Sequence, residues 1–135
     1  MSKKRKYGVF SLERFYPERW ENNTYRIDFE DLYRKGFRGV IFDIDNTLVP
    51  HGAPATKEAI RFFKKLRRIG FQTCLLSNNR KSRVEPFAEA VGSAYIANAH
   101  KPSTGNYLKA CEVMGISRDE AVFVGDQLFT DVYGA

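Results

Sequence analysis

Residues 39–48 read Gly-Val-Ile-Phe-Asp-Ile-Asp-Asn-Thr-Leu, and they join a short apolar run to two carboxylates. The run at residues 40–42 is typical of a buried strand, and side chains alternate along a strand, so Asp43 and Asp45 share one side at its carboxyl end. Two acids there favour a shared cation or a proton transfer, and open α/β sheets bind ligands at this end of their strands. The stretch therefore predicts a metal or phosphoryl-transfer site, with a solvated Asp-rich turn as the alternative.

Strands and helices alternate from residue 38 onward. Apolar runs predict the strands, and apolar residues at helical spacing predict the helices between them. The expected strands cover residues 38–43, 71–76, 94–97 and 121–124, and the expected helices cover residues 54–69, 82–91 and 103–114. The last helix is expected to turn inward Tyr107, Leu108, Cys111 and Met114. This alternation predicts an α/β fold with a doubly wound, Rossmann-like parallel sheet.

The polar segment after residue 124 is expected to begin one more helix, and a sheet of this type would normally gain a further strand beyond it. The sequence ends at Gly134-Ala135, so this C-terminal strand is expected to be missing. Two explanations stay open. Either the sequence is part of a longer protein, or the sheet edge beyond the fourth strand is covered in another way.

Residues 1–37 are rich in aromatic side chains, and they predict an N-terminal extension that packs on a domain formed by residues 38–135. A short helix is expected at residues 28–35, closed by Gly36. No apolar run approaches the ~20 residues that span a bilayer, and no secretory segment follows the basic N-terminus, so a cytoplasmic location is expected. Cys74 and Cys111 stand in apolar contexts and are expected to be buried free thiols.

The net charge of +6 bears on partners. Basic residues concentrate at residues 3–6, 64–68 and 80–83, and they favour an anionic partner such as nucleic acid, anionic lipid or a phosphorylated substrate. A solvated surface that keeps the protein soluble explains the same charge equally well. Aromatic residues beside basic ones near the N-terminus also suggest contact with an anionic membrane surface, although packing on the domain explains them better.

The other predicted strands also end in polar side chains. Ser77 and Asn78 follow the second strand, and they can hold phosphate oxygens or cap the next helix. Lys101 follows the third and can clamp a carboxylate and a phosphoryl group. Asp126 follows the fourth, after Gly125, and Asp131 comes five residues later, where an acid also suits a helix N-terminus. Four strand ends with such chemistry indicate one shared site.

This ordered set resembles the haloacid dehalogenase superfamily of phosphohydrolases, and within it the subfamily IIIA, YqeG-type branch, whose characterised relatives include phosphatidylglycerophosphate phosphatases. The first motif is similar to residues 43–47, the second to Ser77, the third to Lys101 and the fourth to Asp126 with Asp131. The resemblance covers residues 38–134. The family's remaining strand would lie beyond residue 135.

The resemblance implies a Mg²⁺-dependent phosphatase. Asp43 would attack phosphorus and form an aspartyl-phosphate, and Asp45 would act as acid and then as base. Lys101 would neutralise charge during the transfer. The other expected roles are phosphate binding by Ser77, Asn78 and Thr47, metal binding by Asp43, Asp45 (through its backbone carbonyl) and Asp126, and ordering of the metal's surroundings by Asp131.

The segments after the first two motifs bear on the substrate. Superfamily members insert cap domains there, but residues 49–76 and 79–100 have room only for the predicted helices and strands. A capless site favours a large or lipid-borne phosphate such as phosphatidylglycerophosphate. A nucleic-acid 3′-phosphate and a phosphoprotein are the alternatives within the same fold. A non-catalytic basic binding module is the alternative from another class.

Overall fold

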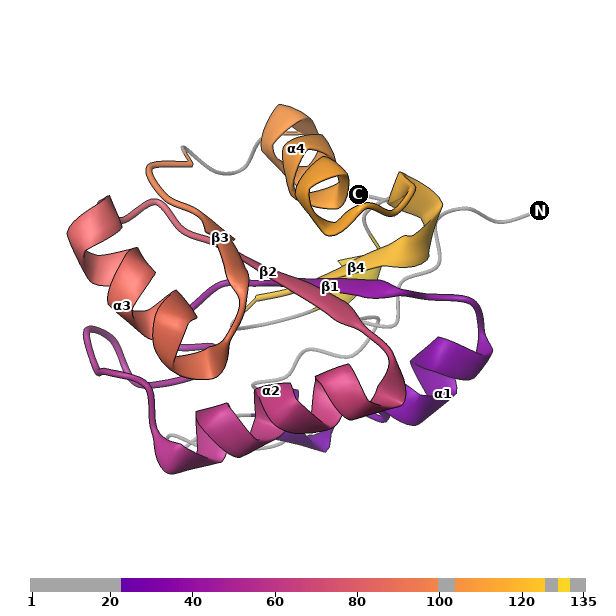
Figure 1. The fold of residues 1–135 in the computed structure, drawn as a ribbon, viewed down its shortest axis with the longest axis horizontal. Helices are drawn as coiled ribbons and strands as arrows, with labels where there is room; N and C mark the ends of the chain where they lie inside the picture. Colours follow the sequence, from indigo (N-terminus) through magenta and orange to yellow (C-terminus); the bar gives the residue numbers. More distant parts are fainter. Residues whose placement is uncertain (1–22, 100–103, 126–128, 132–135) are drawn as a thin grey trace.

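The sheet contains five strands in the order β3-β2-β1-β4-β5 (Figure 1). The computed structural model describes residues 23–99, 104–125 and 129–131. The strands are β1 Gly39–Phe42, β2 Gln72–Leu76, β3 Ala94–Ile96, β4 Ala121–Val124 and β5 Phe129–Asp131. The first four are parallel to one another, which confirms the predicted parallel α/β sheet.

The fifth strand corrects one expectation. The residues expected to continue into a helix form β5 instead, which pairs antiparallel with β4. Only residues 125–128 separate the two strands. A return to a parallel strand needs a crossover of a dozen or more residues, whereas a short connection allows an antiparallel pair. β5 therefore lies along the edge that the sequence left open.

Helices cover both faces of the sheet (Figure 1). Helices α1, α2 and α3 pack on one face with one group of core side chains, and α4 packs on the other with a second group. The bounds are α1 Phe29–Arg34, α2 Lys57–Ile69, α3 Lys81–Val91 and α4 Thr104–Met114, with 3-10 turns η3 Asn23–Arg26 and η4 Arg118–Glu120. No helix in the described ranges has the length and apolarity to cross a bilayer.

Two details of the helices differ from the expectations. Helix α2 begins three residues after Pro54, because Thr56 is its N-cap and accepts the Ala59 N–H at 3.0 Å. Leu108 was expected inside but is 38% exposed. It lies beside the inward stripe of α4, which is formed by Ala110, Cys111 and Met114. The expected cap at Ser103 lies outside the described residues.

Alternate side chains of β1 enter the two core layers. Val40 and Phe42 join the layer under α2, and Ile41 joins the layer under α4. The described part of the N-terminal extension adds Phe29, Leu32 and Phe37 to the first layer. Both cysteines, Cys74 and Cys111, are buried and free, as predicted.

The order of the strands locates a crevice. The chain runs from β1 to its neighbour β2, continues to β3, and then crosses back to β4 on the other side of β1. Connections therefore leave β1 and β4 in opposite directions, which makes their carboxyl ends the switch point where open α/β sheets bind ligands. Asp43 follows β1 at this point, and Gly125 follows β4.

Candidate active site at the carboxyl ends of the strands

The ends of β1 and β4 are in close contact. The Asp43 N–H donates to the Val124 carbonyl at 3.1 Å. A Cβ added to Gly125 would lie 3.3 Å from Asp43 Oδ2, so the bare glycine backbone borders the half-buried carboxylate. Asp126 follows Gly125 in the sequence, but it lies outside the described residues.

A tight turn carries the chain from Asp43 past Asp45. The N–H groups of Thr47 and Leu48 both donate to the Ile44 carbonyl, at 3.2 and 2.9 Å. Asn46 has a φ of 63°, in the left-handed region that Asn tolerates better than most residues. The Asp-x-Asp-Asn sequence, which is typical of a turn, therefore forms a turn here. The same turn presents both carboxylates at the edge of the sheet.

Three donors among the described residues hold the Asp45 carboxylate, and they come from three segments. The Gly52 N–H and the Arg83 guanidinium both donate to Oδ1 at 2.7 Å, and the Asn79 side-chain amide donates to Oδ2 at 3.3 Å. Burial raises the pKa of Asp45, but the Gly52 N–H, the Arg83 guanidinium and the charge of His51 outweigh it and bring the pKa below its usual value. Asp45 is therefore ionised at neutral pH.

Sequence reasoning gave no site role to Gly52, Asn79 or Arg83. Arg83 lies in the first turn of α3, which carries no acidic residue there, although the helix dipole disfavours a cation at that end. An anionic partner stabilises a cation in that position, and this signal applied equally to Arg83 and to Lys81 in the same turn. Asn79 directly follows the predicted phosphate-binding pair, so its position was also suggestive.

The predicted phosphate-binding residues after β2 reach the same edge. The register pairs Phe42 with Leu75, which aligns the ends of β1 and β2. Ser77 is buried, and its hydroxyl accepts the Asn79 N–H at 3.0 Å, so its own O–H can donate elsewhere. Asn78 is exposed beside it. Binding of phosphate by Ser77 and Asn78 stays a prediction.

The other predicted site residues are placed less fully. Thr47 is fully buried, and its hydroxyl has no hydrogen-bond partner among the described residues, so a role in binding phosphate stays a prediction. The backbone of Asp131 lies in β5 opposite Val122, not at a helix N-terminus as the sequence suggested. Lys101 lies outside the described residues, as does Asp126.

The donor set at this edge fits a hard divalent cation. The Asp43 carboxylate is half-buried at the switch point, and the Asp45 carbonyl oxygen accepts no backbone hydrogen bond from the described residues. Carboxylate and carbonyl oxygens are ligands that Mg²⁺ prefers. The Asp45 side chain is already engaged by Arg83, which suits ligation through its backbone oxygen. Within the described ranges there is no cluster of three potential metal-binding side chains, and the third predicted ligand is Asp126.

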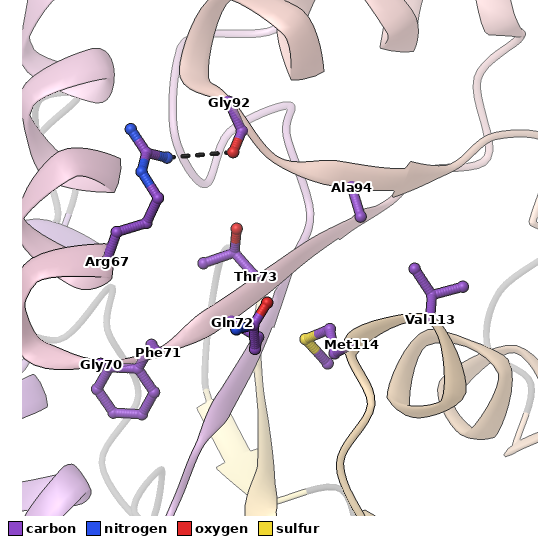
Figure 2. A pocket seen from close by; sticks show the side chains of 9 residues that line it. All are labelled: Arg67, Gly70, Phe71, Gln72, Thr73, Gly92, Ala94, Val113 and Met114. Atoms are coloured by element: carbon purple, nitrogen blue, oxygen red, sulfur yellow. Dashed lines mark hydrogen bonds between the residues drawn. The ribbon is translucent and has the colours of Figure 1, made fainter.

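A hollow at the opposite edge of the sheet has different chemistry. This cavity of about 400 Å³ is lined by residues at the amino ends of β2 and β3 and at the end of α4 (Figure 2). Its lining contains no carboxylate, histidine or cysteine. Its one cation, Arg67, already donates to the carbonyls of Val91 and Gly92. The cavity thus lacks the groups that the predicted chemistry needs.

No cap domain covers the candidate site from the segments where one was considered. Residues 49–76 contain only α2 and β2, and residues 79–99 contain only α3 and β3. Those segments therefore leave the edge of the sheet open, as their lengths predicted.

Three comparisons relate the chain to known proteins. The family model of haloacid dehalogenase-like hydrolases matches residues 54–135. The chain is 36% identical over 121 residues to the "Probable phosphatase YqeG" of Bacillus subtilis, covering 89% of this chain and 70% of that protein. It is 31% identical to the "Phosphatidylglycerophosphate phosphatase 1, chloroplastic/mitochondrial" of Arabidopsis thaliana, covering 80% of this chain but only 34% of that protein.

A solved structure shares the fold. The structure of a putative subfamily III A hydrolase from Legionella pneumophila superposes with a TM-score of 0.56 at 19% identity, over 70% of this chain and 58% of that one.

Proposed function

We propose that this chain, which belongs to the family of haloacid dehalogenase-like hydrolases and is a phosphatase, depends on Mg²⁺ and hydrolyses phosphomonoesters through an aspartyl-phosphate on Asp43. One observation carries the proposal. The Asp43 carboxylate lies at the switch point against Gly125, and the carboxylate of Asp45, two residues later, is held at the same edge by three donors. A nucleophile and an acid-base group are thus provided by one turn.

The chemistry proceeds in two displacements. Asp45 is ionised in the free chain and takes up a proton as the phosphate dianion binds beside it, because a nearby negative charge favours the neutral acid. The Asp43 carboxylate then attacks phosphorus, the bond to the leaving oxygen breaks, and Asp45 gives that oxygen its proton. Asp45 then takes a proton from water, the resulting hydroxide attacks phosphorus, and the bond to Asp43 breaks to release phosphate. Both carboxylates return to their starting states, so the proton is conserved over the cycle.

The remaining predicted residues act on charge. Mg²⁺, held by Asp43, the Asp45 carbonyl and Asp126, would supply the positive charge that lets an anionic nucleophile approach a phosphate dianion. The Ser77 hydroxyl and Asn78 would hold phosphoryl oxygens, and Lys101 would neutralise developing charge.

A simple assay tests this mechanism. With p-nitrophenyl phosphate and Mg²⁺, we expect activity that is lost on chelation and restored by added Mg²⁺. Asp43→Asn should abolish turnover, and Asp45→Asn should lower it by roughly 10²-fold or more. Asp31→Asn is the matched control, because Asp31 is an acid on α1 that pairs only with neighbouring surface cations. Full activity of Asp43→Asn would refute the mechanism, and a wild-type chain inactive on every phosphoester would favour the binding module.

The open edge of the sheet supports a large or lipid-borne substrate, with phosphatidylglycerophosphate as the first candidate. The likeness to the Arabidopsis phosphatidylglycerophosphate phosphatase supports the same choice. A phosphate at a membrane surface would need no cap to exclude water from the far side, because the membrane itself would cover the open edge.

The solvent face of α2 supports contact with an anionic surface. Helix α2 connects the carboxyl end of β1 to the amino end of β2, so it begins at the catalytic edge. Its exposed side chains include one acid, Glu58, and a basic face formed by Lys57, Arg61, Lys64, Lys65, Arg67 and Arg68. None of these cations forms an ion pair with another described residue. Lys65 and Arg68 also line a groove of about 610 Å³, whose other charged residues are Arg34 of α1, which pairs with Asp31, and Glu30.

Vesicle binding tests the basic face. We expect the chain to bind vesicles that contain phosphatidylglycerol more tightly than zwitterionic vesicles, with about 1 kcal/mol from each basic residue near the surface. Reversing two charges, Lys65→Glu with Arg68→Glu, should remove most of the difference, because each reversal loses one attraction and adds one repulsion. Lys109→Glu with Arg118→Glu is the matched control, because these exposed residues lie on α4 and η4.

Turnover assays distinguish the alternative substrates. Turnover that is indifferent to anionic lipid would refute the lipid proposal. Efficient release of phosphate from polynucleotide 3′ ends, or from a phosphoprotein, would assign the basic face to that partner instead.

A further inference from the structure

The Asp45 carboxylate is anchored unequally at its two oxygens. Oδ1 receives both short hydrogen bonds, from the Gly52 N–H and from Arg83, each at 2.7 Å. Among the described residues, Oδ2 receives only the longer bond from Asn79, at 3.3 Å. A carboxylic proton cannot sit on an oxygen that already accepts two donors without displacing one of them. Oδ2 is thus the oxygen that can carry a proton while Oδ1 stays anchored.

We propose that Arg83 is a positioning residue that anchors Asp45 through Oδ1, so that Oδ2 exchanges the proton with the leaving oxygen and then with water. This inference rests on the proposed function, because it assumes that Asp45 is the acid-base group. In the first displacement the proton leaves Oδ2 for the leaving oxygen, and Asp45 becomes a carboxylate. The guanidinium of Arg83 stabilises that product carboxylate and thereby favours the transfer.

Three features distinguish this contact from an ordinary surface ion pair. The side chains of Arg83 and Asp45 are only 18% and 17% exposed, so solvent screens their attraction less than it would on the open surface. Arg83 stands in the first turn of α3 against the helix dipole. Its Nε is buried and has no hydrogen-bond partner among the described residues. A side chain that tolerates both penalties is held by the carboxylate it meets.

The hydrogen bonds of the Asp45 carboxylate join elements that are distant in the sequence. Asp45 follows β1, Gly52 lies in the loop before α2, Asn79 follows β2, and Arg83 belongs to α3. The rotamer of Asp45 is therefore set by tertiary contacts and not by its own turn. Removing Arg83 leaves the Gly52 and Asn79 donors in place, so the side chain keeps its bonds but loses its charged anchor.

Leaving-group dependence separates this role from a structural one. Proton donation matters most for a poor leaving group, so two substrates with the same phosphate and different leaving oxygens report on it. With glycerol phosphate, an alkyl ester, we expect Arg83→Ala to lower kcat/KM by roughly 10²-fold. With p-nitrophenyl phosphate, whose leaving group needs no proton, kcat/KM should change by less than about threefold. The ratio kcat/KM covers only the steps up to departure of the leaving group, so the later action of Asp45 as base, which is common to both substrates, does not affect it.

The controls use neighbouring or conservative changes. Arg80→Ala removes the same charge from the exposed residue just before α3 and should alter neither substrate. Arg83→Lys keeps the charge with a shorter reach and should recover part of the loss on the alkyl ester. In the Asp45→Asn background, Arg83→Ala should add no further loss, because the two residues act as one unit. Thermal denaturation confirms that each variant is folded, and Arg83→Lys carries the test if Arg83→Ala is not.

The following results would contradict the inference. Equal losses of kcat/KM on the alkyl and aryl esters would make Arg83 a structural residue or a direct phosphate ligand, because neither role depends on the leaving group. Additive losses with Asp45→Asn would show that the two side chains act separately. A wild-type chain that hydrolyses neither ester would refute the proposed function and this inference together, which distinguishes that failure from a failure of Arg83 alone.

Discussion

A single methyl group added at Gly125 tests whether the reacting carboxylate lies where β1 meets β4. The Cβ of an alanine there would lie 3.1 Å from Phe123 Cε2 and 3.3 Å from Asp43 Oδ2, closer than an ordinary van der Waals contact. The backbone at Gly125 does not have a positive φ, so alanine fits its conformation. The neighbours must therefore move by a few tenths of an ångström, and one of them is the proposed nucleophile.

The expected effect is on rate more than on stability. Gly→Ala at a compatible position stabilises by about 0.4–1 kcal/mol, and this offsets much of the roughly 1 kcal/mol cost of mild overpacking. Misplacing a reacting group by about 1 Å can lower the rate about 10²-fold, so a displacement of a few tenths of an ångström should lower kcat by about tenfold. The assay is kcat on p-nitrophenyl phosphate, with thermal denaturation of the same samples.

Gly39→Ala is the contrasting control at the other end of the sheet. Its added Cβ would lie 2.3 Å from Ile116 Cδ1 and 3.0 Å from Met114 Sδ, in the packed layer under α4. We expect a loss of about 1–3 kcal/mol in the free energy of unfolding, with kcat per folded molecule unchanged. If Gly125→Ala kept the full kcat of the wild type, the Asp43 carboxylate beside Gly125 would not be the reacting group, and the reasoning would be wrong.

Four further predictions concern stability and reactivity. Phe63→Ala should lower the free energy of unfolding by about 3–5 kcal/mol in urea titration, because Phe63 is fully buried and packs against Phe42 with ring centroids 5.2 Å apart. Thr56→Ala should lower it by about 1 kcal/mol through loss of the α2 cap, and a loss below a few tenths would contradict that role. Burial raises the pKa of Cys74 to about 12 and also raises the pKa of the Cys111 thiol, so iodoacetamide at pH 8 should label neither until denaturant is added. The pKa of Cys74 is raised in the folded state, so the contribution of this thiol to the free energy of unfolding should be complete below about pH 9 and be lost as the pH rises toward 12. The Cys74→Ala variant should not show this pH-dependent loss.

Local sequence patterns predicted most of the fold. The period of apolar residues placed the four parallel strands and the main helices close to their observed bounds, because burial of one helix face or of a whole strand leaves a direct mark on the sequence. The sequence patterns predicted less well where a helix boundary or the edge of a buried face had to be placed. The helix expected from Pro54 begins at Lys57, because Thr56 is its N-cap, and Leu108 lies beside the buried stripe of its helix. The segment after residue 124 carries no periodic pattern, so its antiparallel pairing with β4 could not be foreseen.

By itself the sequence determined which polar side chains lie at the edge of the sheet, since Asp43, Asp45 and Ser77 follow apolar runs whose carboxyl ends must meet in a parallel sheet. Tertiary structure alone decided which groups hold those side chains. The anchoring of Asp45 by Gly52, Asn79 and Arg83 joins residues up to 38 positions apart, and no local pattern encodes such a contact. The periodicity of a strand depends on residues that are neighbours in the sequence. A hydrogen bond between distant residues depends on where the folded backbone places the donor and the acceptor.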